Sequence, residues 1–222
     1  MENRNSGAGS EEFGAEIPVT PQEVFVKGIY SSVDRAVARE LDRLRSEDCI
    51  MPACQSGCCY CCRYHILTNI AEAHALAQYI KRAISVEQID ELRMRTQQWH
   101  EWNRYMQGRH QSADIDEETD FSHYSHCCPL LVNDTCSVYP VRPVVCRTHF
   151  VSSHPHFCYA AKDPQLREDA PVVLTSVVAA ALPFSKAIGD HIEKAGLDFS
   201  RSQMLLPHLL AIEMGWPFAI SP

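Results

Sequence analysis

The sequence predicts a mainly α-helical protein in which helices pack around an irregular, cysteine-rich metal-binding layer. Two observations predict the helices: apolar residues recur at steps of three and four over long stretches, and helix-capping residues precede those stretches. A third observation predicts the layer, because the cysteines gather in two segments, 54–62 and 127–158. We therefore predict a disordered tail over residues 1–18 and a single helical domain over residues 19–222 that contains both segments.

The first helix is predicted over residues 20–46. Thr20 suits the N-cap, Pro21 suits the first helical position, and Glu23 can close a capping box. Apolar residues then return every three or four positions from Val26 to Leu44, which is typical of an amphipathic helix.

Two more helices are predicted over residues 69–106. Asn69 and Glu72 suit the start of one of them, and Ser85 and Gln88 suit the start of the other. None of the helical regions shows the strict alternation of a half-buried strand.

Residues 171–212 are predicted to return to helices. The apolar stretch "APVVLTSVVAAALPF" is interpreted as a buried helix, and "SRSQMLLPHLLAIEM" as the last helix.

The second cysteine segment is predicted to be irregular or to form a hairpin, without helix. Asn133-Asp134 is a turn signal, and prolines at 129, 140 and 143 interrupt any helical pattern.

Charge and hydropathy exclude several classes of partner. The formal net charge of −8 argues against a nucleic-acid backbone, which requires a basic face. The acidic run 114–120 is interpreted as a solvated loop. Residues 1–18 lack the basic and apolar regions of a signal peptide, and they offer almost no apolar surface to offset the entropy of ordering. The longest apolar stretch is shorter than the ~20 residues that span a bilayer. We expect a cytoplasmic protein without a membrane partner; the sequence indicates no particular protein partner.

Eleven cysteines without a secretion signal argue for metal ligands or redox groups, because disulfides do not persist in a reducing cytoplasm. Thiolates that converge repel one another unless a cation neutralises them, which zinc, iron or an iron–sulfur cluster does. The predicted ligands are Cys54, Cys58, Cys61, Cys62, Cys128, Cys136, Cys146 and Cys158. The remaining three, Cys49, Cys59 and Cys127, are interpreted as small buried apolar side chains.

The spacing of the first segment allows Cys54, Cys58 and Cys61 (or Cys62) to share one face if the segment is helical. The same spacing occurs in radical S-adenosylmethionine enzymes, but the alternating strands and helices of their barrel do not follow here. Adjacent thiolates rarely grip one ion, so Cys61 and Cys62 are expected to face different ions, or one of them is spare.

Other residues of the layer could support the thiolates. His149 and His156 are reserve ligands. Arg142 and Arg147 flank Cys146 and could donate hydrogen bonds to its sulfur, or form surface salt bridges instead.

The stretches "CQSGCCYCC", "EAHALAQYI" and "CPLLVNDTCSVYPVRPVVCR" resemble the YkgJ-type cysteine-cluster family, which is described as zinc- or iron-chelating. The resemblance covers about residues 54–160. Its matching positions are Gly57, Cys58, Cys61, Cys62, Glu72, Ala73, Cys128, Pro129, Leu131, Cys136, Tyr139, Arg142, Pro143, Cys146 and Arg147. Cys59 and Cys127 are extra, and three residues rather than two separate Cys54 from Cys58.

The resemblance implies a metal-binding domain but supplies no reaction. We expect a cytoplasmic protein that chelates zinc or iron through its cysteine cluster. The alternative is an iron–sulfur enzyme, because a similar cluster occurs in flagellin lysine methylases and would suit a protein-modifying activity. No familiar catalytic motif is present in the sequence, so no catalytic residue is assigned.

Overall fold

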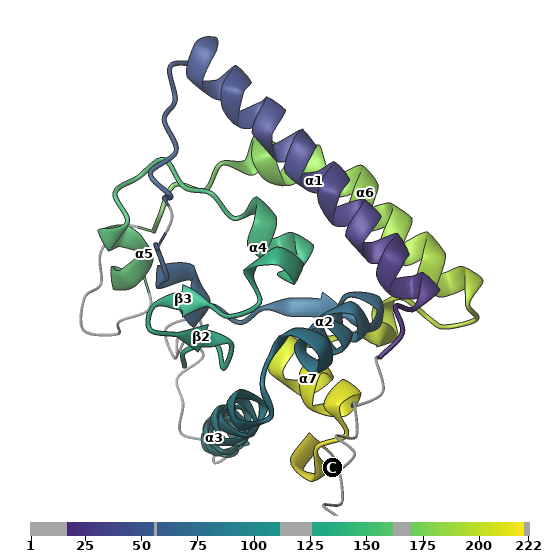
Figure 1. Ribbon diagram of the computed structural model, residues 1–222. Coiled ribbons are helices and arrows are strands. Elements are labelled where there is room, and N and C mark those ends of the chain that lie inside the picture. Colours follow the sequence, from purple (N-terminus) through teal and green to yellow (C-terminus); the bar gives the residue numbers. More distant parts are fainter. Residues whose placement is uncertain (1–16, 56, 112–125, 162–169, 220–222) are drawn as a thin grey trace, which may run out of the picture.

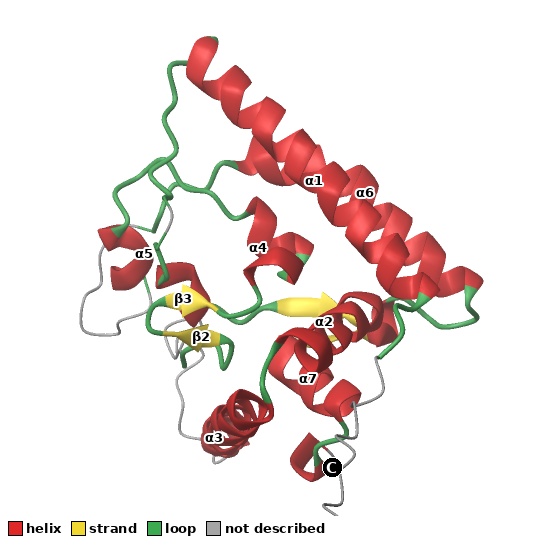
Figure 2. Ribbon diagram, viewed as in Figure 1, coloured by secondary structure: helices red, strands yellow, loops and turns green. Residues whose placement is uncertain are grey.

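A computed structural model describes residues 17–55, 57–111, 126–161 and 170–219. In this part of the chain the protein is mainly helical, as predicted (Figure 2). The predicted tail falls outside the described residues except for residues 17 and 18, and the acidic run 114–120 lies outside them as well.

Two long helices, α1 (Pro21–Ser46) and α6 (Thr175–Lys194), lie side by side along one edge of the molecule (Figure 1). The predicted cap of α1 is confirmed, because the Thr20 side chain accepts a hydrogen bond from the Glu23 N–H at 3.1 Å. The Glu23 carboxylate, expected to close a capping box, instead pairs with Lys27 and with Arg82 of α2. Glu23 is fully buried, so this pairing ties α1 to α2.

Three further helices build the opposite side: α2 (Ile70–Ala83), α3 (Val86–Gln111) and α7 (Leu206–Met214). The caps predicted for α2 and α3 are confirmed. Asn69 accepts from the Glu72 N–H at 3.0 Å, and Ser85 and Gln88 exchange two hydrogen bonds of 3.3 Å. Helix α2 packs against α1 and α7, and α3 packs against α7.

A short antiparallel sheet overturns part of the helix prediction. Strand β1 (Leu67–Asn69) pairs with β4 (Gln203–Leu205), Leu67 opposite Leu205, where the sequence had predicted helix over the later segment. Three residues are too few to display a two-residue period, so only the pairing itself defines these strands.

The helix predicted from residue 171 begins at Thr175 instead. Val173 forms a β-bridge with Val151, and the Leu174 N–H donates to the Phe150 carbonyl at 2.8 Å, so these residues are bound to the cysteine segment. Helix α6 is also not buried all round: Val177 is inaccessible, whereas Leu182 is 59% exposed, because one face packs inward and the other does not.

The second cysteine segment contains the predicted hairpin, built from β2 (Leu131–Val132) and β3 (Thr135–Cys136). Asn133 and Asp134 connect the strands with φ values of 48° and 58°, the left-handed conformation that a two-residue hairpin turn requires. Contrary to prediction, the segment also contains short helices: η3 (Tyr139–Val141), α4 (Val144–Thr148) and α5 (His156–Ala160). Helices this short bury too few residues to show a period.

The core joins the helices to the cysteine layer. Buried apolar residues of α1, α2, α6 and α7 form one cluster that also includes Leu130, Val138 and Val141. The layer therefore supplies part of the core. Among the described residues, no helix is both long and apolar enough to cross a membrane.

Candidate metal centre

The two cysteine segments meet through backbone hydrogen bonds. The Cys128 N–H donates to the Cys62 carbonyl at 2.7 Å, and the Ala53 N–H donates to the Val151 carbonyl at 2.8 Å. The Val151 N–H donates to the sulfur of Cys54 at 3.4 Å. Segments far apart in the sequence are thus fixed against each other before any thiol contact is considered.

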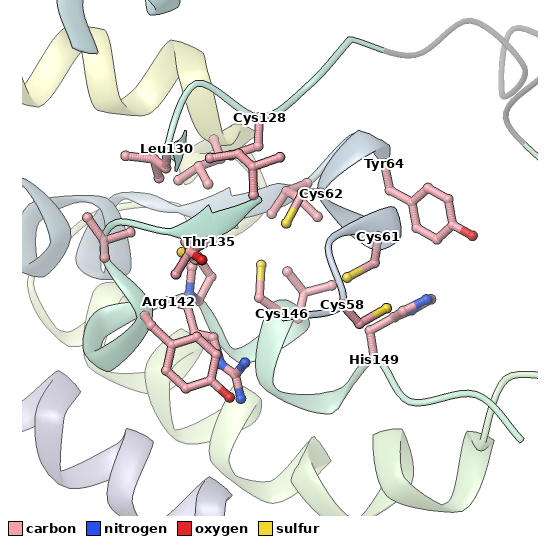
Figure 3. A pocket seen from close by; sticks show the side chains of 18 of the residues that line it. Cys58, Cys61, Cys62, Tyr64, Cys128, Leu130, Thr135, Arg142, Cys146 and His149 are labelled. Atoms are coloured by element: carbon pink, nitrogen blue, oxygen red, sulfur yellow. The ribbon is translucent and has the colours of Figure 1, made fainter. Parts of the chain in front are cut away.

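A cavity of about 310 Å³ lies where the segments meet (Figure 3). Most of the predicted ligands line it: Cys58, Cys61, Cys62, Cys128, Cys136 and Cys146. The other two, Cys54 and Cys158, are not among its lining residues. The rest of the lining is largely apolar, with residues such as Ile66, Leu130 and Val145.

Several local structures position the cavity cysteines. Cys61 and Cys62 lie in the short helix η1 (Tyr60–Arg63), and Cys58 follows Gly57, whose φ of +86° favours glycine. Cys136 ends the hairpin, and Cys146 lies in α4. The shared helical face predicted for Cys54, Cys58 and Cys61 is wrong, because η1 begins at Tyr60 and both earlier cysteines lie outside any helix.

Burial and mutual proximity control the protonation of these thiols. Burial raises the pKa of Cys128 to about 12 and raises the pKa of Cys146 well above its usual value, and neighbouring thiols add to both shifts. The hydrogen bond to Cys61, followed by burial, raises the pKa of Cys62. The same Cys61–Cys62 contact lowers the pKa of Cys61 to about 7, with help from the positive charge of Arg142. Without a cation, most of the set is therefore stable as thiols rather than thiolates.

Among the described residues, no group of three or more Cys, His, Asp or Glu side chains is arranged so that it could hold a metal ion as it stands. The thiols surround the cavity rather than converging on one point. What the structure provides is a buried concentration of soft donors.

The two arginines beside Cys146 have different environments. Arg147 is 4% exposed; it pairs with Asp34 at 2.6 Å and donates to the carbonyls of Pro140 and Arg142. Its partners are oxygen atoms of the scaffold, and the salt bridge joins a buried guanidinium to an Asp34 side chain that is 53% exposed. Arg142 lines the cavity, stacks over the Tyr139 ring at 3.9 Å, and lowers the pKa values of the thiols that it faces. Of the two, Arg142 therefore acts electrostatically on the thiols.

The two reserve histidines differ in their position relative to the cavity. His149 lines the cavity, and its Nε2 atom is buried without a hydrogen-bond partner in the described part of the chain. Its ring meets Tyr64 edge-on, with centroids 5.2 Å apart. His156 is exposed and does not line the cavity.

The three cysteines interpreted as buried apolar side chains are not buried. Cys49 is exposed in a loop with φ of 55°, Cys127 is partly exposed, and the partly exposed Cys59 thiol donates to Asp134 at 3.5 Å. The general tendency of free cysteine to be buried does not hold for these three residues, because all three lie in surface loops or turns. All eleven cysteines lie within the described residues, and all are free.

Two residues that support the centre had no signal in the sequence for that role. Tyr64 donates a hydrogen bond to the sulfur of Cys158. Glu72, recognised in the sequence as part of a helix cap, also accepts from the Val144 N–H at 2.7 Å and thereby holds the start of α4, which carries Cys146.

No family model, curated protein or solved structure matches this chain. The resemblance to the YkgJ-type family consequently depends on the quoted residues and their spacing alone.

Proposed function

We propose that this protein binds zinc or iron through the thiolates of its cysteine centre. The observation that carries the proposal is that six cysteines, from two segments far apart in the sequence, line one cavity. Free thiols grouped in this way are stable in a reducing compartment, so we propose that the protein works in the cytoplasm.

The donor set fits a soft or borderline cation. Zinc and iron–sulfur centres both accept four thiolates, and this centre offers more than four. His149 lines the same cavity, and its buried Nε2, which has no hydrogen-bond partner among the described residues, is a further candidate donor. Because burial opposes ionisation of Cys128 and Cys146, binding a cation would release their protons and couple the binding energy to folding.

The size of the cavity supports an iron–sulfur cluster as a second candidate. Zinc–sulfur bonds of about 2.3 Å place four tetrahedral sulfurs about 3.8 Å apart, which requires the thiols to close around a single ion. A cluster core of several iron and sulfide ions holds its thiolates farther apart and would suit a cavity of about 310 Å³ with less movement. A cluster would also be required for the alternative function, an iron–sulfur enzyme that modifies other proteins.

Anaerobic purification followed by metal analysis, acid-labile sulfide assay and an absorption spectrum tests both candidates. Zinc chelation predicts a colourless protein with bound zinc, whereas a cluster predicts a brown protein that releases sulfide. Cys136→Ser should contain less metal than the wild type, and the matched control Cys49→Ser, at an exposed position outside the cavity, should contain as much. A wild-type protein that contains no metal and takes up neither zinc nor iron(II) in vitro would overturn the proposal.

A further inference from the structure

The cysteines at the cavity do not all face the same way. In Figure 3 the sulfurs of Cys62 and Cys146 point into the cavity, whereas those of Cys58 and Cys61 lie together on the side nearest His149. The adjacent residues Cys61 and Cys62 thus present their thiols to different regions, although the two thiols remain in contact.

Four cysteines form the cavity group: Cys62, Cys128, Cys136 and Cys146. All four line the cavity, and three separate elements carry them, namely η1, the β2–β3 hairpin with the residues that precede it, and α4. The thiols of Cys128 and Cys136 lie within Coulombic range of both Cys62 and Cys146, as does Cys61, which lies at the edge of this group. This group is therefore complete without any residue from outside the cavity.

The other predicted ligands form a second group: Cys58 and Cys61, which line the cavity on the side nearest His149, and Cys54 and Cys158, which lie outside its lining. Cys158 is 4% exposed on α5, which packs against η1, and the rings of Tyr60 and Tyr159 meet there at 6.0 Å. Cys54, Cys58 and Cys61 all lie within Coulombic range of the Cys158 thiol. The Val151 N–H fixes the sulfur of Cys54 at 3.4 Å, and Tyr64 binds Cys158.

A single ion does not accept eight thiolates, and a zinc site or an iron–sulfur cluster is closed by four. We propose that the protein holds two metal centres: an inner one bound by the cavity group and an outer one bound by the second group, with η1 contributing Cys62 to the first and Cys61 to the second. This inference deepens the proposed function and rests on it. On binding, each thiol releases its proton to solvent.

Anaerobic titration with cobalt(II) tests this division, because tetrahedral cobalt–thiolate sites absorb visible light and can be counted. The wild-type protein and Cys49→Ser should each bind two cobalt ions per chain. Cys136→Ser should bind one, through loss of the inner centre, and Cys158→Ser should also bind one, through loss of the outer centre. Combining the last two substitutions should abolish tight binding, with circular dichroism confirming that the helices persist.

The outcomes separate the inference from the proposed function. One cobalt per wild-type chain, or loss of both ions on a single substitution in either group, would overturn the two-centre division while leaving metal binding intact. If Cys158→Ser fails to fold, Cys54→Ser provides the same test of the outer centre. Absence of any uptake of cobalt, zinc or iron(II) by the wild-type protein would overturn the proposed function itself.

Discussion

Replacing Glu72 by alanine is expected to lower the free energy of unfolding by about 2–4 kcal/mol and to weaken metal binding. The Glu72 carboxylate is 4% exposed and accepts three hydrogen bonds: from the Val144 N–H at 2.7 Å, from Asn69 Nδ2 at 2.7 Å and from Thr68 Oγ1 at 3.1 Å. The amide groups of Val144 and Asn69 would lose their acceptor within the protein interior.

The magnitude follows from these lost partners. Each buried donor left unsatisfied costs about 1–3 kcal/mol, and the Thr68 hydroxyl can rotate to another acceptor. Burial raises the pKa of the Glu72 carboxyl because a buried negative charge is unfavourable. Removing this carboxylate therefore offsets part of that loss. Because the Val144 N–H begins the helix that carries Cys146, we expect α4 to move and the inner centre to bind metal less tightly.

Urea unfolding followed by circular dichroism, with cobalt titration of the same samples, measures both effects. Glu72→Gln keeps the size and one acceptor oxygen, but its amide faces a donor, so an intermediate loss of about 1–2 kcal/mol is expected. Glu91→Ala is the matched control: its side chain is 67% exposed and lies 3.6 Å from Arg95, and such pairs contribute about 0–1 kcal/mol. A Glu72→Ala protein as stable as the Glu91→Ala protein would refute the structural role of this carboxylate.

Three other perturbations test separate parts of the structure. Acid should destabilise the protein through His208. Burial, and next the nearby His100, lowers the pKa of His208 in the folded protein to about 4, whereas its pKa in the unfolded chain is about 6.5. The unfolded state therefore binds more protons between these values, and the free energy of unfolding falls as the pH drops from 6.5 towards 4. Urea unfolding at pH 7 and pH 5 measures this fall, which His208→Gln should reduce. Arg147→Met should cost about 1–3 kcal/mol in the same assay, because the carbonyls of Pro140 and Arg142 lose their donor, whereas water can hydrate the half-exposed Asp34 carboxylate; a change below about 0.5 kcal/mol would contradict this. A chelator should lower the melting temperature of the metal-loaded wild type. Cys61→Ser should melt as low without chelator and Cys49→Ser should not; equal melting temperatures for the two variants would contradict a role of the cluster in folding.

Some features of this protein could be predicted from the sequence because short-range interactions determine them. Thr20 and Asn69 cap helices through residues three positions away, and apolar steps of three and four mark the faces that become buried. Asn133-Asp134 predicts a hairpin because both residues tolerate the positive φ that the turn requires. The grouping of cysteines indicated the candidate metal ligands, although metal binding by them stays a prediction.

Tertiary structure decided the features that depend on residues distant in the sequence. The pairing of β1 with β4 defines two strands too short to show a period, and it replaced helix at Gln203–Leu205. The sequence left the two arginines beside Cys146 equivalent, whereas their neighbours direct Arg147 to Asp34 and Arg142 to the thiols. The second role of Glu72 exists because packing brings the Val144 N–H to a carboxylate in another helix. In each case the role of a side chain depends on which group lies within hydrogen-bonding or Coulombic range, and long-range packing, rather than local spacing, determines that neighbour.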